Sequence, residues 1–459
     1  MTADGRLVVD YWEHWNGFEH EAMQAVVDDY NASQDDVFVK MLRVSEIEQK
    51  IILATAGGNP PDVVGLWARN VSTYSEKGAL TPLSKYVRRA GITGDDYIPL
   101  LWELCNYRGH TWGLPTTPGS IGLHWNRRLF REAGLDPDVP PKSIAELEAM
   151  AEKLTVVELT RDGQTRTLRY TELTAEEQAA KDFRIVQLGF SPAEPGWWKE
   201  CWGYWFGADM MDGDEVTANS PANVEAQAWH GSFSEKYGVD NMKRFGASFS
   251  TSFASPQNPF MDGRVAMVLQ GVWLYNFIDR FAPHLDWAAA AFPPSDPDAD
   301  WAEGGVTFLD CDILAIPAGA DLPNEAFDFI RYVQTQRAME KLCLGQRKFS
   351  PLKEYTQDFL DRHPNKHIEL FIALANSPSA KSSPEMSVWQ EYKNEMAAGS
   401  DRIFGGVATA REATAYVEER IQWKLDRALK RWELTGEARA EEWAAWSPPV
   451  TETSAGGGL

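Results

Sequence analysis

Cysteine is scarce in this sequence. The chain has 459 residues and only four cysteines, Cys105, Cys201, Cys311 and Cys343, which lie far apart. No CxxC or CxxH pattern is present, and this excludes the usual structural zinc sites. The spacing allows buried free thiols or one or two disulfides, and it does not distinguish between them.

The motifs that mark many enzymes and cofactor sites are also missing. The sequence has no GxSxG, Walker A, GxGxxG or HExxH motif, which removes the enzyme classes that these motifs identify. His363 and His367 stand four residues apart, but Pro364 lies between them and no acidic third ligand accompanies them. We therefore expect neither a metal site nor a cofactor.

Positive charge and long hydrophobic runs are in short supply. The chain has 44 basic and 67 acidic side chains, which gives a formal net charge of −23. Such a field repels phosphate backbones and anionic membranes, so nucleic acid is not an expected partner. No run of eighteen apolar residues exists, so no transmembrane helix is expected.

Tryptophan, by contrast, is abundant, with 19 residues in the chain. The stretch EPGWWKECWGYWFGAD (194–209) packs four tryptophans, one tyrosine and one phenylalanine into sixteen positions. Such a stretch is either core or a platform for a flat ligand. If it is helical, Trp198, Trp202 and Trp205 form one stripe, which is typical of core.

The N-terminal part alternates strands and helices. LVVDY (7–11), VFVKML (37–42) and PDVVGL (61–66) read as strands, with amphipathic helices between them. This order predicts βαβ units and a mainly parallel sheet, in which ligands bind beyond the carboxyl ends of the strands. The loops expected to carry the site are Trp12–Asn16, Trp67–Asn70 and a turn after WGLPTTPGS (112–120).

Further along, we expect a surface hairpin insertion at 156–185 and helices from about 223 to 245. FMDGRVAMVLQGVW (260–273) reads as a helix end, a glycine turn and a buried strand. A connection rich in proline and aspartate, at 292–305, then leads to the strand CDILAIP (311–317). At this length, two lobes are the prior expectation.

Three segments carry a resemblance to a known family: TAGGNPPDVV, WNRRLFREAGLDPDVPPKSIAELEAMAEKL and FMDGRVAMVLQGVW. In this order and spacing, the chain from about residue 7 to about 435 resembles family 1 of the extracellular solute-binding proteins of ABC importers. That family includes the maltose- and glycerol-3-phosphate-binding proteins. The resemblance implies an α/β, two-lobed periplasmic-binding-protein fold (type II, maltose-binding-protein-like), with a crossover hinge and an interlobe cleft.

The resemblance also implies a discontinuous domain layout. Lobe I would comprise 1–120 and 293–347, and lobe II would comprise 121–292 and 348–446. Residues 447–459, which end in TSAGGGL, would form a flexible tail.

Sugar recognition requires aromatic faces for the ring and planar polar groups for vicinal hydroxyls. In the first two loops the candidates are His14 and Trp15, with Glu13 as a hydroxyl acceptor, and then the segment LWARN. That segment resembles the family's Trp-Ala-x-Asp. It makes Trp67 a stacking residue, Asn70 a hydroxyl ligand in place of the usual aspartate, and Arg69 a bidentate donor.

The remaining candidates lie near the two crossovers and in lobe II. Gly119 stands where sugar binders often have an acid, flanked by Thr117 and Ser120. By resemblance, Glu194 and Trp197 contact ligand, with Trp198 as the alternative platform, while Trp202 and Trp205 pack. The same resemblance adds Trp273 and Trp389 as platforms, and the second crossover adds Gly304, Gly305 and Asp310.

The leading hypothesis is a monomeric binding protein that captures a neutral mono- or oligosaccharide and passes it to a membrane permease, without enzymatic activity. One alternative keeps the fold but binds an anionic polyol, such as a glycerophosphodiester or sugar phosphate, through Arg43, Arg69 or Arg402. Another is a carbohydrate-active enzyme, although no carboxylate pair stands out. The start, MTADGRLVVDYW, is not a signal peptide. We expect an export signal to have been removed and the protein to be periplasmic, or extracellular and lipid-anchored.

Overall fold

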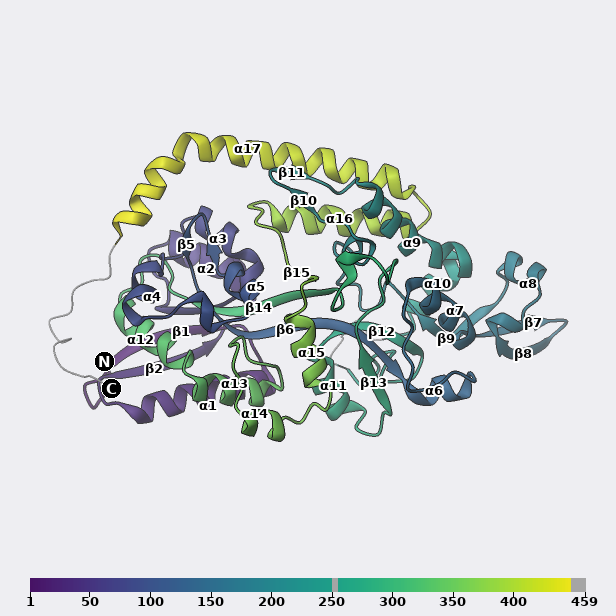
Figure 1. The fold of residues 1–459 in the computed structure, drawn as a ribbon, viewed down its shortest axis with the longest axis horizontal. Coiled ribbons are helices and arrows are strands. Elements are labelled where there is room, and N and C mark those ends of the chain that lie inside the picture. Colours follow the sequence, from purple (N-terminus) through teal and green to yellow (C-terminus); the bar gives the residue numbers. More distant parts are fainter. Residues whose placement is uncertain (250–254, 447–459) are drawn as a thin grey trace.

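The computed structural model describes residues 1–249 and 255–446, so the predicted tail at 447–459 lies outside the described residues. One curved sheet of eleven strands runs through both halves of the molecule (Figure 1). Its main path is β2-β1-β3-β14-β6-β12-β9-β7-β8. Helices cover it along its whole length, which matches the alternation of strands and helices expected from the sequence.

The first half begins with three parallel strands. β1 (Leu7–Glu13) lies between β2 (Val37–Arg43) and β3 (Val63–Trp67) and runs parallel to both. The connecting helices are α1 (Gly17–Ser33) and α2 (Ile47–Ala56), each close to its predicted position. β3 ends at Trp67, so the predicted segment 67–70 does follow the carboxyl end of a strand.

Two long strands join the halves, and here the predicted pattern was wrong. β14 (Thr307–Ala315) runs antiparallel to both β3 and β6 (Leu114–Asn126). β6 pairs with β14 along Leu114–Ser120 and then with β12 along Ile121–Trp125. No turn follows WGLPTTPGS, because the strand continues directly into the second half. The sheet is therefore mixed rather than mainly parallel.

The second half extends the sheet through β12 (Val265–Gly271), β9 (Arg184–Phe190), β7 (Val156–Arg161) and β8 (Gln164–Arg169). β7 and β8 form the predicted hairpin, and β7 also pairs with β9. The hairpin is thus the outer edge of the sheet (Figure 1). β12 is buried along its whole length, as expected for the strand in FMDGRVAMVLQGVW.

The other elements cover these strands or connect them. The helices are α3 (Val71–Glu76), α4 (Ser84–Ala90), α5 (Pro99–Leu104), α6 (Arg127–Glu132), α7 (Ile144–Leu154), α8 (Ala175–Ala180), α9 (Pro221–Tyr237), α10 (Val239–Gly246), α11 (Leu274–Phe281), α12 (Pro323–Val333), α13 (Gln336–Gln346), α14 (Gln357–Arg362), α15 (Ile368–Ala375), α16 (Trp389–Phe404) and α17 (Ala410–Ala445). The short strands are β4 (Asn106–Tyr107), β5 (His110–Thr111), β10 (Met211–Asp212), β11 (Glu215–Val216), β13 (Trp287–Ala290) and β15 (Ala380–Lys381).

Separate hydrophobic cores lie on the two sides of the crossover strands. One core in the first half gathers α1, α12 and α13 against β1, and another lies under α2, α3 and α5. The largest core belongs to the second half and contains Trp202, Trp205 and Trp389. The lobe boundaries stay a prediction, but Leu352 and Phe359 pack in a first-half core. The segment after residue 347 therefore does not pass directly to the second half.

α17 stands out by its length of 36 residues, or about 54 Å. It crosses over both halves of the molecule (Figure 1).

Within residues 1–249 and 255–446, no helix combines the length and hydrophobicity that a bilayer-spanning segment requires. All four cysteines are buried free thiols.

The contact between β9 and α7 leaves no room for a side chain at Gly189. A Cβ built there would lie 2.1 Å from the carbonyl oxygen of Ala151, whose backbone cannot yield cheaply. We predict that Gly189→Ala lowers the free energy of unfolding by about 1–3 kcal/mol, measured by urea denaturation. Gly246→Ala is the matched control, because a Cβ at Gly246 meets nothing within 4 Å. Equal stability of the two variants would contradict this packing.

Candidate ligand-binding site

The candidate site is organised on the paired crossover strands. Asp310 of β14 lies opposite Gly119 of β6, and opposite residues of an antiparallel pair face the same side of the sheet. A Cβ on Gly119 would lie 2.6 Å from the Trp273 ring, and one on Gly271 would lie 2.3 Å from it. The indole of Trp273 therefore rests on the backbone of two glycines, on the same side as Asp310. Gly119, where an acid was expected in the family, makes room for this ring.

Arg69 and Asp310 form an ion pair beside this tryptophan. Nη1 of Arg69 lies 2.5 Å from Oδ2 of Asp310, and the Arg69 backbone N–H also donates to that carboxylate at 3.3 Å. The guanidinium carbon is 4.9 Å from the centroid of the Trp67 ring. Burial alone would lower the pKa of Arg69, but the charge of Asp310 raises it above its ordinary value. Arg69 is therefore protonated at this site, and its Nη1 already donates to Asp310.

His14 packs against Trp67, with ring centroids 4.1 Å apart. Its Nδ1 lies 2.8 Å from Oε1 of Glu13, and its Nε2 lies 3.6 Å from Oδ1 of Asp312. Burial opposes protonation, but the hydrogen bond and charge of Glu13 and the charge of Asp312 raise the pKa of His14. Glu13 itself is fully buried and also accepts a hydrogen bond from Tyr11. It therefore serves His14 rather than standing open as the predicted hydroxyl acceptor.

Asp312 links several of these groups and was missed from the sequence. The hydroxyl of Thr117 donates to its Oδ2 at 2.7 Å, and Nζ of Lys348 lies 3.6 Å from the same oxygen. Lys348 also lies 3.2 Å from Glu19. The sequence could have indicated Asp312, because it stands two positions after Asp310 in a strand. Side chains two positions apart in a strand point to the same face of the sheet. Lys348 offered no such signal, since it arrives from a distant part of the chain.

The tryptophan-rich stretch does not form the single helix considered above. Only Trp202–Phe206 is helical, as a short 3₁₀ helix, and Trp202 and Trp205 lie in the second-half core. Trp198 is 8% exposed and donates its indole N–H to the carbonyl of Leu269 at 3.0 Å. Its ring centroid is 6.1 Å from that of Trp273. Trp198 therefore reaches the crossover site.

Glu194 and Trp197 begin the same stretch. Trp197 is 43% exposed, and its ring lies edge-on to Trp198 at 6.1 Å. Burial raises the pKa of Glu194 to about 7. A carboxyl group with a pKa of about 7 is partly protonated at neutral pH.

Several predicted ligand contacts are built into the packing. Trp15 is 4% exposed within a first-half core, and Asn70 donates its side-chain amide to Glu48. Ser120 points to the other face of the sheet, where its hydroxyl donates to the Phe371 carbonyl at 2.8 Å. Gly305, at φ +91°, faces Leu374. Trp389 is fully buried and stacks on Tyr392. A ligand-contact role for these five residues stays a prediction.

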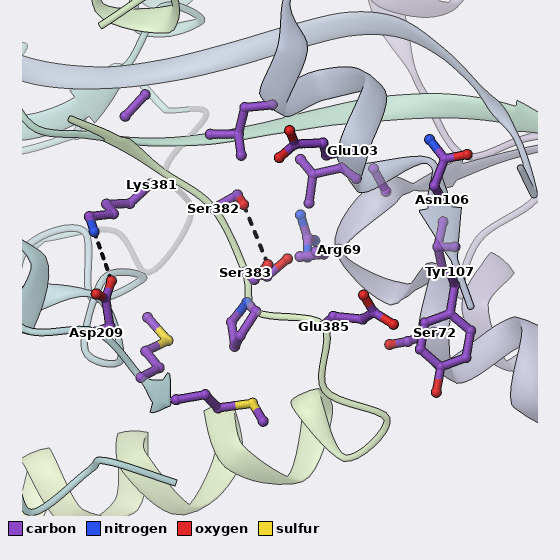
Figure 2. Close-up of a pocket in the computed structure, with 18 of the residues that line it drawn as sticks. Arg69, Ser72, Glu103, Asn106, Tyr107, Asp209, Lys381, Ser382, Ser383 and Glu385 are labelled. Atoms are coloured by element: carbon purple, nitrogen blue, oxygen red, sulfur yellow. Dashed lines mark hydrogen bonds and ion pairs between the residues drawn. The ribbon is translucent and has the colours of Figure 1, made fainter. Parts of the chain in front are cut away.

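A polar cavity lies on the other side of Arg69 (Figure 2). It has a volume of about 360 Å³ and lies between α3, α5 and the start of β4 on one side and the segment around Asp209–Met211 on the other. The segment 380–385 runs through it, and Lys381 pairs with Asp209 at 2.8 Å (Figure 2). Sequence reasoning did not single out these residues. Arg69 alone belongs to both the cavity and the crossover site.

A family model described as bacterial extracellular solute-binding protein matches residues 25–366. The chain belongs to this family. The match covers most of the chain and confirms the family expected from the three sequence segments.

Known relatives share limited identity with this solute-binding protein. The maltotriose-binding protein of Pyrococcus abyssi is 21% identical over 365 residues, which is 78% of this chain and 68% of that protein. The sn-glycerol-3-phosphate-binding periplasmic protein UgpB of Pectobacterium atrosepticum is 24% identical over 163 residues, or 34% of this chain and 37% of that protein.

Among solved structures, CpMnBP1 with mannobiose bound superimposes with a TM-score of 0.75 at 24% identity. The match covers 90% of this chain and 99% of that one. The predicted two-lobed periplasmic-binding-protein fold is thereby confirmed.

The raised pKa of Glu194 predicts a pH dependence of stability. Because the folded state binds this proton more tightly than the unfolded state, the contribution of Glu194 to stability is most favourable below about pH 4.5 and declines as pH rises through 7. The loss is at most about 3 kcal/mol. Glu194→Gln should flatten this decline when free energies of unfolding from urea titrations are compared at pH 5 and pH 8. The exposed Glu437→Gln serves as control, and an unchanged decline in Glu194→Gln would contradict the burial of the carboxyl group.

Proposed function

We propose that this chain is the substrate-binding component of an ABC importer and that it captures a neutral carbohydrate between its two lobes. The observation that carries the proposal is the Trp273 indole, seated on Gly119 and Gly271 beside the Arg69–Asp310 pair. An indole face covers the C–H face of a sugar ring, and adjacent charged groups bind its hydroxyls. The names of two similar proteins, one maltotriose-binding and one with mannobiose bound, point the same way.

The two lobes contribute different parts of this site. His14, Trp67 and Arg69 come from the first half, whereas Trp198 and Trp273 come from the second, and all meet at β6 and β14. A sugar held between them stabilises the closed arrangement by its higher affinity for that state. The closed complex then passes its ligand to a membrane permease. We propose a monomer that acts outside the cytoplasmic membrane, in the periplasm or on a lipid anchor, and that performs no catalysis.

The second candidate function is binding of an anionic polyol, which the UgpB relative favours. Such a ligand requires cations that converge on its phosphate. Arg69 is already paired with Asp310, while Arg43 and Arg402 are exposed at the ends of β2 and α16. We therefore rank the neutral sugar first.

A thermal-shift screen followed by calorimetry tests this ranking. Neutral mono- and oligosaccharides are expected to raise the melting temperature, and the best of them to bind at micromolar or tighter affinity, about −8 kcal/mol. If only phosphorylated polyols shift it, the second candidate is correct. Reaction products after long incubation with oligosaccharides would instead identify an enzyme.

Two tryptophans carry the specific prediction. Trp273→Ala and Trp67→Ala should each weaken sugar binding by about 30-fold or more, because each removes a stacking face. Circular dichroism should show both variants folded. The control is Trp423→Ala, since Trp423 is 56% exposed on α17. Retained affinity in both site variants would refute the stacking model.

A further inference from the structure

α17 is anchored on both halves of the molecule. Its N-terminal part packs Val417, Ile421 and Leu425 into the second-half core. Near its C-terminal end, Trp443 enters a first-half core, with its ring 4.7 Å from that of Trp112. Between these anchors α17 passes over α3, and a groove remains between the two helices. Figure 1 shows this helix spanning the top of the molecule.

The groove is strongly basic. It has a volume of about 370 Å³, and it is lined by five basic residues against two acidic ones. The basic residues are Lys77, Lys424, Arg427, Arg431 and Arg439. This local excess of cations is unusual in a chain whose net charge is −23. Glu76 and Glu391 in the same lining offset part of the repulsion among these cations, and a bound anion would offset more of it.

The basic residues of α17 share one face. Lys424, Arg427, Arg431 and Arg439 follow one another at intervals of three, four and eight residues, which keeps them on one side of a helix. Lys77 faces them from the end of α3. Some of these charges have partners: Lys424 lies 3.7 Å from Glu395, and Arg439 donates to the backbone carbonyl of Glu76.

The other cations are available to a ligand. Lys77 and Arg431 are exposed and form no ion pair within the described part of the chain. Arg427 lies over the ring of Trp423 at 4.6 Å, a contact that orients its guanidinium without neutralising it. Thr73 and Thr435 also line the groove, and their hydroxyls donate to the backbone carbonyls of Ser387 and Arg431.

We propose that this groove binds a small oxyanion, either free phosphate or sulfate or the phosphate of a small organic molecule. Lys77 holds it from the first lobe, and Arg427 and Arg431 hold it from α17 through charge-assisted hydrogen bonds. Trp423 and Trp432 supply flat walls for an organic part. This site is separate from the sugar site at the crossover strands, and it does not depend on the proposed carbohydrate function.

Calorimetry of the full chain with sodium phosphate tests the proposal, with sodium chloride at equal ionic strength as the blank. We expect saturable binding to the wild type and at least a tenfold loss of affinity in Arg427→Gln/Arg431→Gln. The control Arg411→Gln/Lys430→Gln removes the same charge from α17 outside the groove, and it should stay within twofold of wild type. A hexose phosphate that binds more tightly than phosphate identifies an organic ligand, and equal affinities identify the free anion.

Two further measurements test the groove: phosphate binding by a variant of Lys77, and neutral-sugar binding by all groove variants. Lys77→Gln lies on the opposite wall and should also lose phosphate binding, so the result does not rest on α17 variants alone. Neutral-sugar binding should be unchanged in all groove variants, which separates this site from the crossover site. The proposal is overturned if phosphate does not bind saturably to the wild type, or if the groove variants bind it as the wild type does.

Discussion

The antiparallel pairing of β6 with β14 is the constraint on which the rest of this molecule depends. These strands carry the chain between the halves, and their register places Asp310 opposite Gly119. Because opposite residues share a face, Asp310 lies on the same side of the sheet as the tryptophan that rests on Gly119. The alternate face packs against α15, where Ser120 binds the Phe371 carbonyl. One face of the pair therefore carries the candidate site, and the other packs against α15.

Burial of charge explains why so many polar groups near this pair are linked. An isolated ion inside a protein is costly, so Arg69 pairs with Asp310, and Asp312 is shared by His14, Thr117 and Lys348. These links hold the side chains in place before any ligand arrives. They also limit the choice of ligand, because a cation that is already neutralised attracts a phosphate less strongly than a free one. The basic groove under α17 has the opposite character, with cations that outnumber their partners.

α17 gives the two halves a second connection, far along the chain from the crossover strands. In a two-lobed binding protein the lobes move about a hinge, and a rigid helix that packs on both lobes restricts that movement. Leu425 of α17 packs in the second-half core, and Trp443 packs in a first-half core.

The sequence by itself determined much of the architecture. The strands at 7–11, 37–42 and 61–66 followed from periodicity, and the family followed from three segments in a specific order. The resemblance to the family indicated Trp67 and Trp273, and residue chemistry near the expected loops and crossover indicated Arg69 and Asp310; their ligand contacts stay predictions. Only the tertiary structure decided that β6 continues without a turn, that Glu13 serves His14, and that Asp312 and Lys348 share one network. These depend on strand register and on contacts between residues far apart in the chain, which local pattern does not encode.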